Sequence, residues 1–196
     1  MDPNSQLHPA FRHSYYLFRR KVFRIFGGFF HVYDESGNVA LYSEQASFKL
    51  REDFTVYTGD TKEAVLKIKT PHILDVGATY EITDPRNMEV AGSLRRRFLK
   101  SIFKDEWTIL SPDGQTIGKV VETDIIGAFL SRWINLVPQK YTVYTESGQP
   151  VAAIKQHFNP FVLKYSMTLL EPEPPLNRRL IVAAGILLAA IERRQR

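Results

Sequence analysis

The sequence predicts a mainly β protein: a closed antiparallel barrel of about twelve strands around a central apolar C-terminal helix. Three observations lead to this fold class. Short β-favouring runs recur in pairs joined by turns, no long helix separates most of these pairs, and one apolar segment follows the last strand. A sheet of this size that no helices cover must split or close on itself.

Five predicted hairpins supply ten of the strands. In each hairpin an aromatic residue begins a run of β-favouring residues, a turn rich in Asp, Asn, Gly or Pro follows, and a second run comes after it. The paired runs are 30–33 with 39–42, 54–57 with 64–69, 80–82 with 90–97, 107–110 with 116–121, and 141–144 with 151–156. Segments 15–23 and 163–170 bring the total to about twelve strands.

Length and composition suit one domain in a reducing compartment. The 196 residues can enclose one sizeable core, and we expect a flexible segment at 1–14 followed by a single barrel domain at 15–196. The absence of cysteine excludes disulfides and thiolate metal sites. Residues 1–9 lack the basic start and apolar core of a secretory signal, so we expect a cytoplasmic protein.

Residues 125–137 form the first of two predicted helices. Thr123 and Asp124 are suitable caps, Pro138 stops the helix, and apolar residues fall on one stripe of it. The stripe is compatible with packing over one end of the barrel or with binding at a membrane surface.

The second predicted helix lies within residues 177–194. Leu180–Ile191 is apolar on every face, and at about 1.5 Å per residue it is roughly 18 Å long. A transmembrane helix needs about 20 apolar residues, so we expect no transmembrane span and interpret the run as a core helix that fills the barrel. A tail anchor is the alternative. The predicted core contacts are Leu180, Ala184, Leu187, Leu188 and Ile191.

The order of these elements resembles that of a known family. The sequence FHVYDESGNV at 30–39, SFKL at 47–50, LKIK at 66–69 and the apolar C-terminal helix are similar to the LURP-one-related family. That family is grouped with tubby C-terminal domains and phospholipid scramblases, and the resemblance implies a twelve-stranded barrel around a central helix. Tubby domains bind phosphoinositides through basic residues, so the resemblance also implies an anionic phospholipid partner.

A search for catalytic patterns leads us to expect no enzyme, no cofactor and no metal site. The histidines are scattered, and neither a nucleophile elbow nor a phosphate-binding loop is present. Asp34–Asn38 has some calcium-loop character but lacks the later bidentate Glu, so turn formation explains it better. The chain also lacks the cysteine-rich and acidic segments of scramblases, which argues against calcium-driven lipid scrambling.

Two basic groups are the candidate lipid-binding residues. They are Arg95, Arg97, Lys100 and Lys104 in one group, and Arg19, Arg20 and Lys21 in the other. Phenylalanines lie among both groups, and basic residues beside exposed rings suit an anionic bilayer. In a strand, Arg96 points away from Arg95 and Arg97. The alternative is a solvated strand face whose aromatic residues point into the core.

Three functions remain compatible with the sequence. The first is a non-catalytic module that binds anionic phospholipid at the membrane periphery, and the second is a protein-interaction scaffold. The third, single-stranded nucleic-acid binding, is the least favoured because the net charge of +5 is modest.

Overall fold

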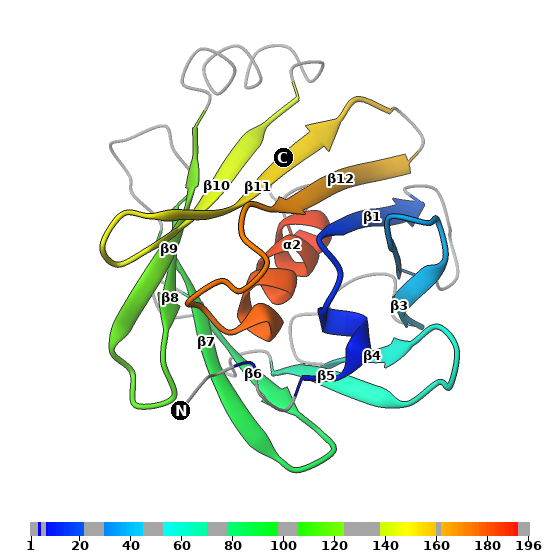
Figure 1. The fold of residues 1–196 in the computed structure, drawn as a ribbon, viewed down its shortest axis with the longest axis horizontal. Helices are drawn as coiled ribbons and strands as arrows, with labels where there is room; N and C mark the ends of the chain where they lie inside the picture. Colours follow the sequence, from blue (N-terminus) through cyan, green and yellow to red (C-terminus); the bar gives the residue numbers. More distant parts are fainter. Residues whose placement is uncertain are drawn as a thin grey trace.

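A closed twelve-stranded antiparallel barrel surrounds one helix in the computed structural model (Figure 1). The structure describes residues 4, 7–21, 30–44, 53–69, 78–97, 106–123, 138–159 and 162–191. Each strand pairs with its neighbours in the chain, and the first and last strands pair with each other, which closes the barrel. The predicted fold class is therefore confirmed.

The twelve strands coincide with the twelve predicted segments. They are β1 (Tyr15–Lys21), β2 (Phe30–Tyr33), β3 (Val39–Ser43), β4 (Phe54–Thr58), β5 (Ala64–Lys69), β6 (Thr79–Asp84), β7 (Glu89–Arg97), β8 (Glu106–Leu110), β9 (Thr116–Glu122), β10 (Lys140–Thr145), β11 (Pro150–His157) and β12 (Val162–Leu169). A short 3-10 helix, η1 (Pro9–Phe11), precedes them, and the helix α2 (Arg178–Ile191) follows them. The helix predicted at 125–137 lies outside the described residues.

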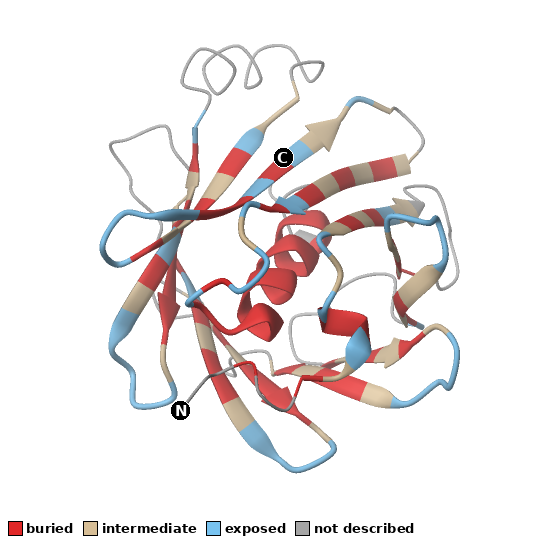
Figure 2. Ribbon diagram, in the orientation of Figure 1, coloured by how far each residue is buried: buried red, intermediate tan, exposed pale blue. Residues whose placement is uncertain are grey.

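Alternating side chains separate the inside of the barrel from the outside. In β4, Phe54 and Val56 are buried, whereas Thr55 and Tyr57 are partly exposed. The same alternation along the other strands gives a banded pattern of burial in Figure 2. Because successive side chains in a strand point to opposite faces, the apolar half of each strand meets α2 and the polar half faces solvent.

Short turns join alternate strand pairs at one end of the barrel, which we call the turn end. Three of these turns share one design: Gly37, Gly114 and Gly148 adopt φ of 82°, 83° and 86°, values that favour glycine. In the first, the Asp34 carboxylate accepts hydrogen bonds from the backbone N–H groups of Ser36 (2.9 Å) and Asn38 (2.8 Å). The Asp34 side chain thus stabilises the turn, as predicted for this segment.

The helix α2 lies inside the barrel along its axis, as the apolar run predicted. Every residue from Arg178 to Ala190 is buried, including Leu180, Ala184, Leu187 and Leu188 (Figure 2). The Asn177 side chain caps the helix, because its Oδ1 accepts a hydrogen bond from the backbone N–H of Arg179 at 2.9 Å. The side chain of Ile191 and residues 192–194 are outside the described part of the chain.

Gly185 lets the middle of α2 approach β1 closely. A Cβ atom at this position would lie 2.4 Å from Cζ of Phe18 and 2.9 Å from Cε of Met167. Phe18 is fully buried, so its ring occupies the space that a side chain on the helix would need. The pairing of a glycine on the helix with a phenylalanine on the strand sets how deeply α2 sits against β1 and β12.

Two buried arginines begin α2 at the turn end. Positive charge at a helix N-terminus opposes the helix dipole, so these side chains need partners. Arg178 Nη1 donates to the backbone oxygens of Phe11 (2.9 Å) and His13 (3.1 Å), and Arg178 Nη2 donates to that of Pro172. Arg179 binds Glu89 with Nη2 at 3.0 Å from Oε2.

Asp84 completes this cluster of charges. Its buried carboxylate lies 3.4 Å from Nη1 of Arg179 and 2.6 Å from Nη2 of Arg86. Burial by itself raises the pKa of Asp84, but the hydrogen bonds from Arg86 and the charges of Arg86 and Arg179 outweigh it, so the pKa lies below its usual value.

The segment before β1 packs against the same end of the barrel. We expected residues 1–14 to be flexible, but Leu7, Ala10 and Phe11 are part of the buried core. Asn4 is also buried, and its side chain donates to the backbone oxygen of Pro174 at 3.2 Å and accepts from the backbone N–H of Arg178 at 3.0 Å. These contacts hold Asn4 and Phe11 against the start of α2.

We predict that removing Leu180–Arg196 makes the protein aggregate. Burial of Leu187 or Leu188 contributes about 1.5–3 kcal/mol each, and the loss of many such residues exceeds the roughly 5–15 kcal/mol by which domains are stable. Size-exclusion chromatography and circular dichroism would measure this. A monomeric truncation with an unchanged melting temperature would contradict the role of α2 in the core.

We also predict that Gly185→Leu destabilises the protein by about 1–3 kcal/mol, as overpacked cores commonly are. Leu favours helices more than Gly does, so the loss must come from the clash with Phe18. Urea unfolding would measure it. The double variant Gly185→Leu with Phe18→Ala should recover part of the loss, whereas strictly additive effects would show that the two positions do not compete for space.

The contribution of Asp84 to the free energy of unfolding should depend on pH, and the variant Asp84→Asn tests this. A carboxylate whose folded pKa is lowered stabilises the protein at pH above its unfolded pKa, and that stabilisation is lost as the pH falls through the folded pKa. We expect Asp84→Asn to be less stable than the unmodified protein near neutral pH, with a smaller difference in acid. Urea unfolding between about pH 7 and about pH 3 would measure this, and a constant difference would contradict it.

Candidate anion-binding surface

Acidic residues are distributed unevenly around the barrel wall. Within their bounds, the neighbouring strands β10, β11, β12, β1, β2, β3, β4 and β5 contain no Asp or Glu. The acidic residues within strands all lie on the other side, in β6 to β9: Glu81, Asp84, Glu89, Glu106 and Glu122. One side of the barrel wall therefore has no negative charge on its strands.

Cations cluster on the outer face of four strands on that side. In the register of the sheet, Arg19 of β1 lies opposite Lys164 of β12, Lys164 lies opposite His157 of β11, and Lys155 of β11 lies opposite Lys140 of β10. Directly opposite residues in antiparallel strands have Cβ atoms about 4.5–5.5 Å apart. We call Lys140, Lys155, His157, Lys164 and Arg19 the basic wall.

Three cations of the basic wall have no acidic partner among the described residues. Arg19, Lys140 and Lys155 are exposed, and Lys164 is partly exposed. Among the residues that the structure describes, no carboxylate forms an ion pair with Arg19, Lys155 or Lys164. By contrast, Lys67 and Lys69 of β5 are paired with Asp53 (2.9 Å) and Glu81 (2.6 Å). The positive charges of Arg19, Lys155 and Lys164 are thus directed to solvent.

His157 lies between two lysines of the wall. Its Nε2 is 2.8 Å from the hydroxyl oxygen of Ser166 on β12. Burial lowers the pKa of His157, and the positive charges of Lys155 and Lys164 lower it further. The imidazole therefore takes up a proton at a lower pH than an unperturbed histidine does.

Aromatic rings continue this surface on the neighbouring strands. Tyr33 of β2, Tyr42 of β3 and Tyr57 of β4 are partly exposed, and we call them the tyrosine row. The rings of Tyr42 and Tyr57 stack with centroids 5.5 Å apart, and the guanidinium carbon of Arg19 lies 5.5 Å from the centroid of the Tyr33 ring. Arg19 thereby joins the tyrosine row to the basic wall.

The predicted group around β1 is divided by the structure. Arg19 belongs to the basic wall, whereas Arg20 Nη1 donates to the carbonyl oxygen of Ala190 at 2.6 Å, at the C-terminal end of α2. The side chain of Lys21 is not among those described. Of the two alternatives for the aromatic residues of this group, Phe18 follows the second: its ring points into the core against Gly185.

Of the predicted group around β7, Arg95 and the backbone of Arg97 lie on the opposite side of the barrel. Arg95 is exposed and its Nε donates to the hydroxyl of Thr79 at 3.1 Å, while Arg96 is buried, as strand alternation predicted. The side chain of Arg97, and Lys100 and Lys104 altogether, lie outside the described residues. Since β7 is the sixth strand from β1 in either direction, Arg95 does not share a face with Arg19.

Four members of the basic wall were missed in the sequence: Lys140, Lys155, His157 and Lys164. Their spacing contained part of the signal, because Lys155 and His157 lie two residues apart and therefore share a strand face. What brings them beside Lys164 and Arg19 is the register between β11, β12 and β1. Strand register depends on contacts between distant segments.

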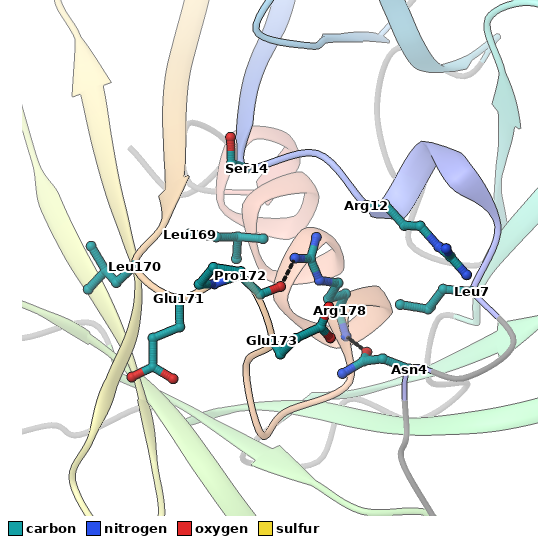
Figure 3. A pocket seen from close by; sticks show the side chains of 10 residues that line it. All are labelled: Asn4, Leu7, Arg12, Ser14, Leu169, Leu170, Glu171, Pro172, Glu173 and Arg178. Atoms are coloured by element: carbon teal, nitrogen blue, oxygen red, sulfur yellow. Dashed lines mark hydrogen bonds between the residues drawn. The ribbon is translucent and has the colours of Figure 1, made fainter.

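A cavity of about 730 Å³ opens at the turn end, between the segment before β1 and the linker after β12 (Figure 3). Arg178 points into it, but its guanidinium donates to the backbone oxygen of Pro172 and to those of Phe11 and His13. Arg12, Glu171 and Glu173 also line the cavity and give it mixed charge. The guanidinium of Arg178 is therefore used to hold the linker and the N-terminal segment together.

The described residues include neither a cluster that could hold a metal ion nor a helix that could cross a membrane. Within the described part of the chain, no group of three or more His, Asp or Glu side chains is arranged to hold a metal ion. In the same residues, no helix is both long enough and apolar enough to cross a membrane.

The sequence places the chain in a known family. The family profile described as LURP-one-related matches residues 16–189, which is most of the chain. The chain belongs to the LURP-one-related family. A protein of Arabidopsis thaliana, known from an X-ray structure, is similar with a TM-score of 0.51 and 16% identity over 92% of this chain and 94% of that one. This similarity shows that the LURP-one-related protein and the Arabidopsis protein share a fold. No protein of curated function matches the chain in sequence.

Proposed function

We propose that this LURP-one-related protein is a non-catalytic module that binds anionic phospholipid at a membrane surface through the basic wall. The observation that carries the proposal is the charge distribution: four cations lie on four adjacent strands whose bounds include no acidic residue. Like charges placed this closely repel one another, and an anionic surface relieves that repulsion.

The expected strength of this binding follows from the number of cations. Each Lys or Arg near an anionic membrane contributes about 1 kcal/mol, so Arg19, Lys155 and Lys164 together contribute about 3 kcal/mol, or roughly a hundredfold in affinity. Such binding is measurable and reversible. It also weakens with salt, because the Debye length falls from about 10 Å at 0.1 M to about 3 Å at 1 M.

The tyrosine row supports the same assignment. Tyr is enriched where bilayers meet water, because its ring is apolar and its hydroxyl is polar. Tyr33, Tyr42 and Tyr57 are partly exposed and lie on the strands next to the basic wall. A membrane that contacts Arg19 therefore also meets Tyr33, whose ring Arg19 covers. The protein would act as a peripheral membrane module in the cytoplasm.

Charge reversal on the basic wall provides the test. We predict that the protein sediments with vesicles of phosphatidylcholine containing phosphatidylglycerol but not with phosphatidylcholine alone. Lys155→Glu with Lys164→Glu should reduce this binding by at least about 100-fold, because each change removes an attraction and adds a repulsion. Both side chains are at least partly exposed, so the melting temperature should change little.

Arg95→Glu is the matched comparison, since it reverses one exposed charge on the acidic side of the barrel. If the β7 group also binds lipid, as the sequence suggested, this variant loses affinity as well; the charge distribution predicts a smaller loss than on the basic wall. Equal binding to neutral vesicles, or no binding to any vesicle, would reject the lipid assignment. Capture of an acidic protein or of a single-stranded oligonucleotide instead would favour the scaffold or the nucleic-acid function.

A further inference from the structure

Of the five residues of the basic wall, His157 is the one whose charge ordinarily changes near neutral pH, and His31 of β2, opposite Arg19, is a second imidazole beside the wall. On its own strand, Lys155 shares its face; on β12, Lys164 lies opposite it and Ser166 contacts its Nε2 at 2.8 Å. One strand further on each side, Lys140 of β10 lies opposite Lys155 and Arg19 of β1 lies opposite Lys164. All the charged side chains within these four strands are therefore positive.

This arrangement opposes protonation of the free protein. A proton on His157 would place another positive charge between Lys155 and Lys164. Because the ring is partly buried, water would also solvate that charge less well than at the surface. Both effects hold the pKa of His157 below its usual value. Near neutral pH, the free protein consequently presents a neutral imidazole at the centre of the wall.

An anion on the wall would reverse this balance. A phosphoryl group that lies between Lys155 and Lys164 offsets their charges, and its oxygens accept hydrogen bonds from a protonated imidazole and from the Ser166 hydroxyl. The imidazolium has two N–H donors, so it can bind Ser166 with one and the phosphoryl oxygen with the other. Anion binding and proton uptake at His157 would then favour each other, as thermodynamic linkage requires.

We propose that His157 is a proton-coupled contact for the phosphodiester group of an anionic lipid, so that the membrane affinity of this protein rises as the pH falls. The proposal rests on the lipid-binding function proposed above and adds a regulatory element to it. The proton comes from solvent and remains on the imidazole while the lipid is bound, so no covalent bond changes.

The sign and size of the effect follow from linkage. If binding raises the pKa of His157, the bound state holds more protons, and affinity increases on acidification until both states are protonated. Each pKa unit of increase gives at most about a tenfold gain in affinity. We therefore expect affinity to rise about 3- to 30-fold between about pH 8 and about pH 5 beyond what a protein without this imidazole shows.

The experiment compares the unmodified full chain with His157→Gln across this pH range. The probe is vesicles of phosphatidylcholine with phosphatidylglycerol, because the charge of a phosphodiester does not change between these pH values. Gln is polar and can still bond Ser166 but cannot take up a proton. We expect a rise in affinity on acidification that is largely lost in His157→Gln. His13→Gln is the matched control, since His13 lies beside Glu35 at the turn end, 3.2 Å away, and should retain the rise.

A second experiment measures the protonation of His157 directly. Nuclear magnetic resonance of the imidazole gives the His157 pKa in the unmodified protein, with and without vesicles, and does not depend on whether His157→Gln folds. The same pKa measurement is repeated with glycerophosphoglycerol, which is the headgroup of phosphatidylglycerol without its acyl chains. A pKa that rises with both probes indicates recognition of the phosphodiester itself, and a pKa that rises with vesicles only indicates that the lipid surface is needed.

Two results would overturn the proposal. One is a His157 pKa that does not rise when vesicles are bound; the other is an equal pH dependence of affinity in the unmodified protein and in His157→Gln. If binding to phosphatidylglycerol vesicles persists in either case, only the proton coupling is rejected. Absence of vesicle binding at every pH rejects the lipid-binding function itself, so the two failures are distinguishable.

Discussion

The structure depends on an apolar helix that can be buried only by a barrel closed around it. From Arg178 to Ala190, α2 has no exposed residue, so no open sheet could cover it. Its two ends need polar partners in the same interior: Arg179 reaches Asp84 and Glu89 at one end, and Arg20 reaches the carbonyl of Ala190 at the other. Closure of β1 on β12 brings these partners together.

Because α2 fills the barrel, the interior is used for stability and the outer face is left for binding. Phe18 packs against Gly185, and the pair leaves no room there for a ligand. The acidic residues of β6 and β7 include Asp84 and Glu89, which hold the start of α2. The opposite strands contain cations without acidic residues; there Arg20 holds the other end of α2 from inside the barrel, and Arg19 next to it faces outward.

Most of the fold could be predicted because it follows from local patterns. Alternation in runs such as Phe54–Thr58, and turns such as Asp34–Asn38, depend on residues close in sequence. The candidate site was harder to predict from the sequence. Arg19 was chosen for its position in a basic run, but its neighbour Arg20 contacts Ala190, and the run itself does not distinguish the two.

The strand count, the turn positions and the burial of α2 were present in the amino-acid sequence, since each follows from spacing, turn chemistry or the length of one apolar run. The basic wall was not. Lys155, Lys164 and Arg19 lie on three strands from two distant parts of the chain, and they become neighbours only when β12 pairs with both β11 and β1 in one register. Pairing across the closed barrel is a long-range property, and a shift of one residue would turn these side chains to the other face.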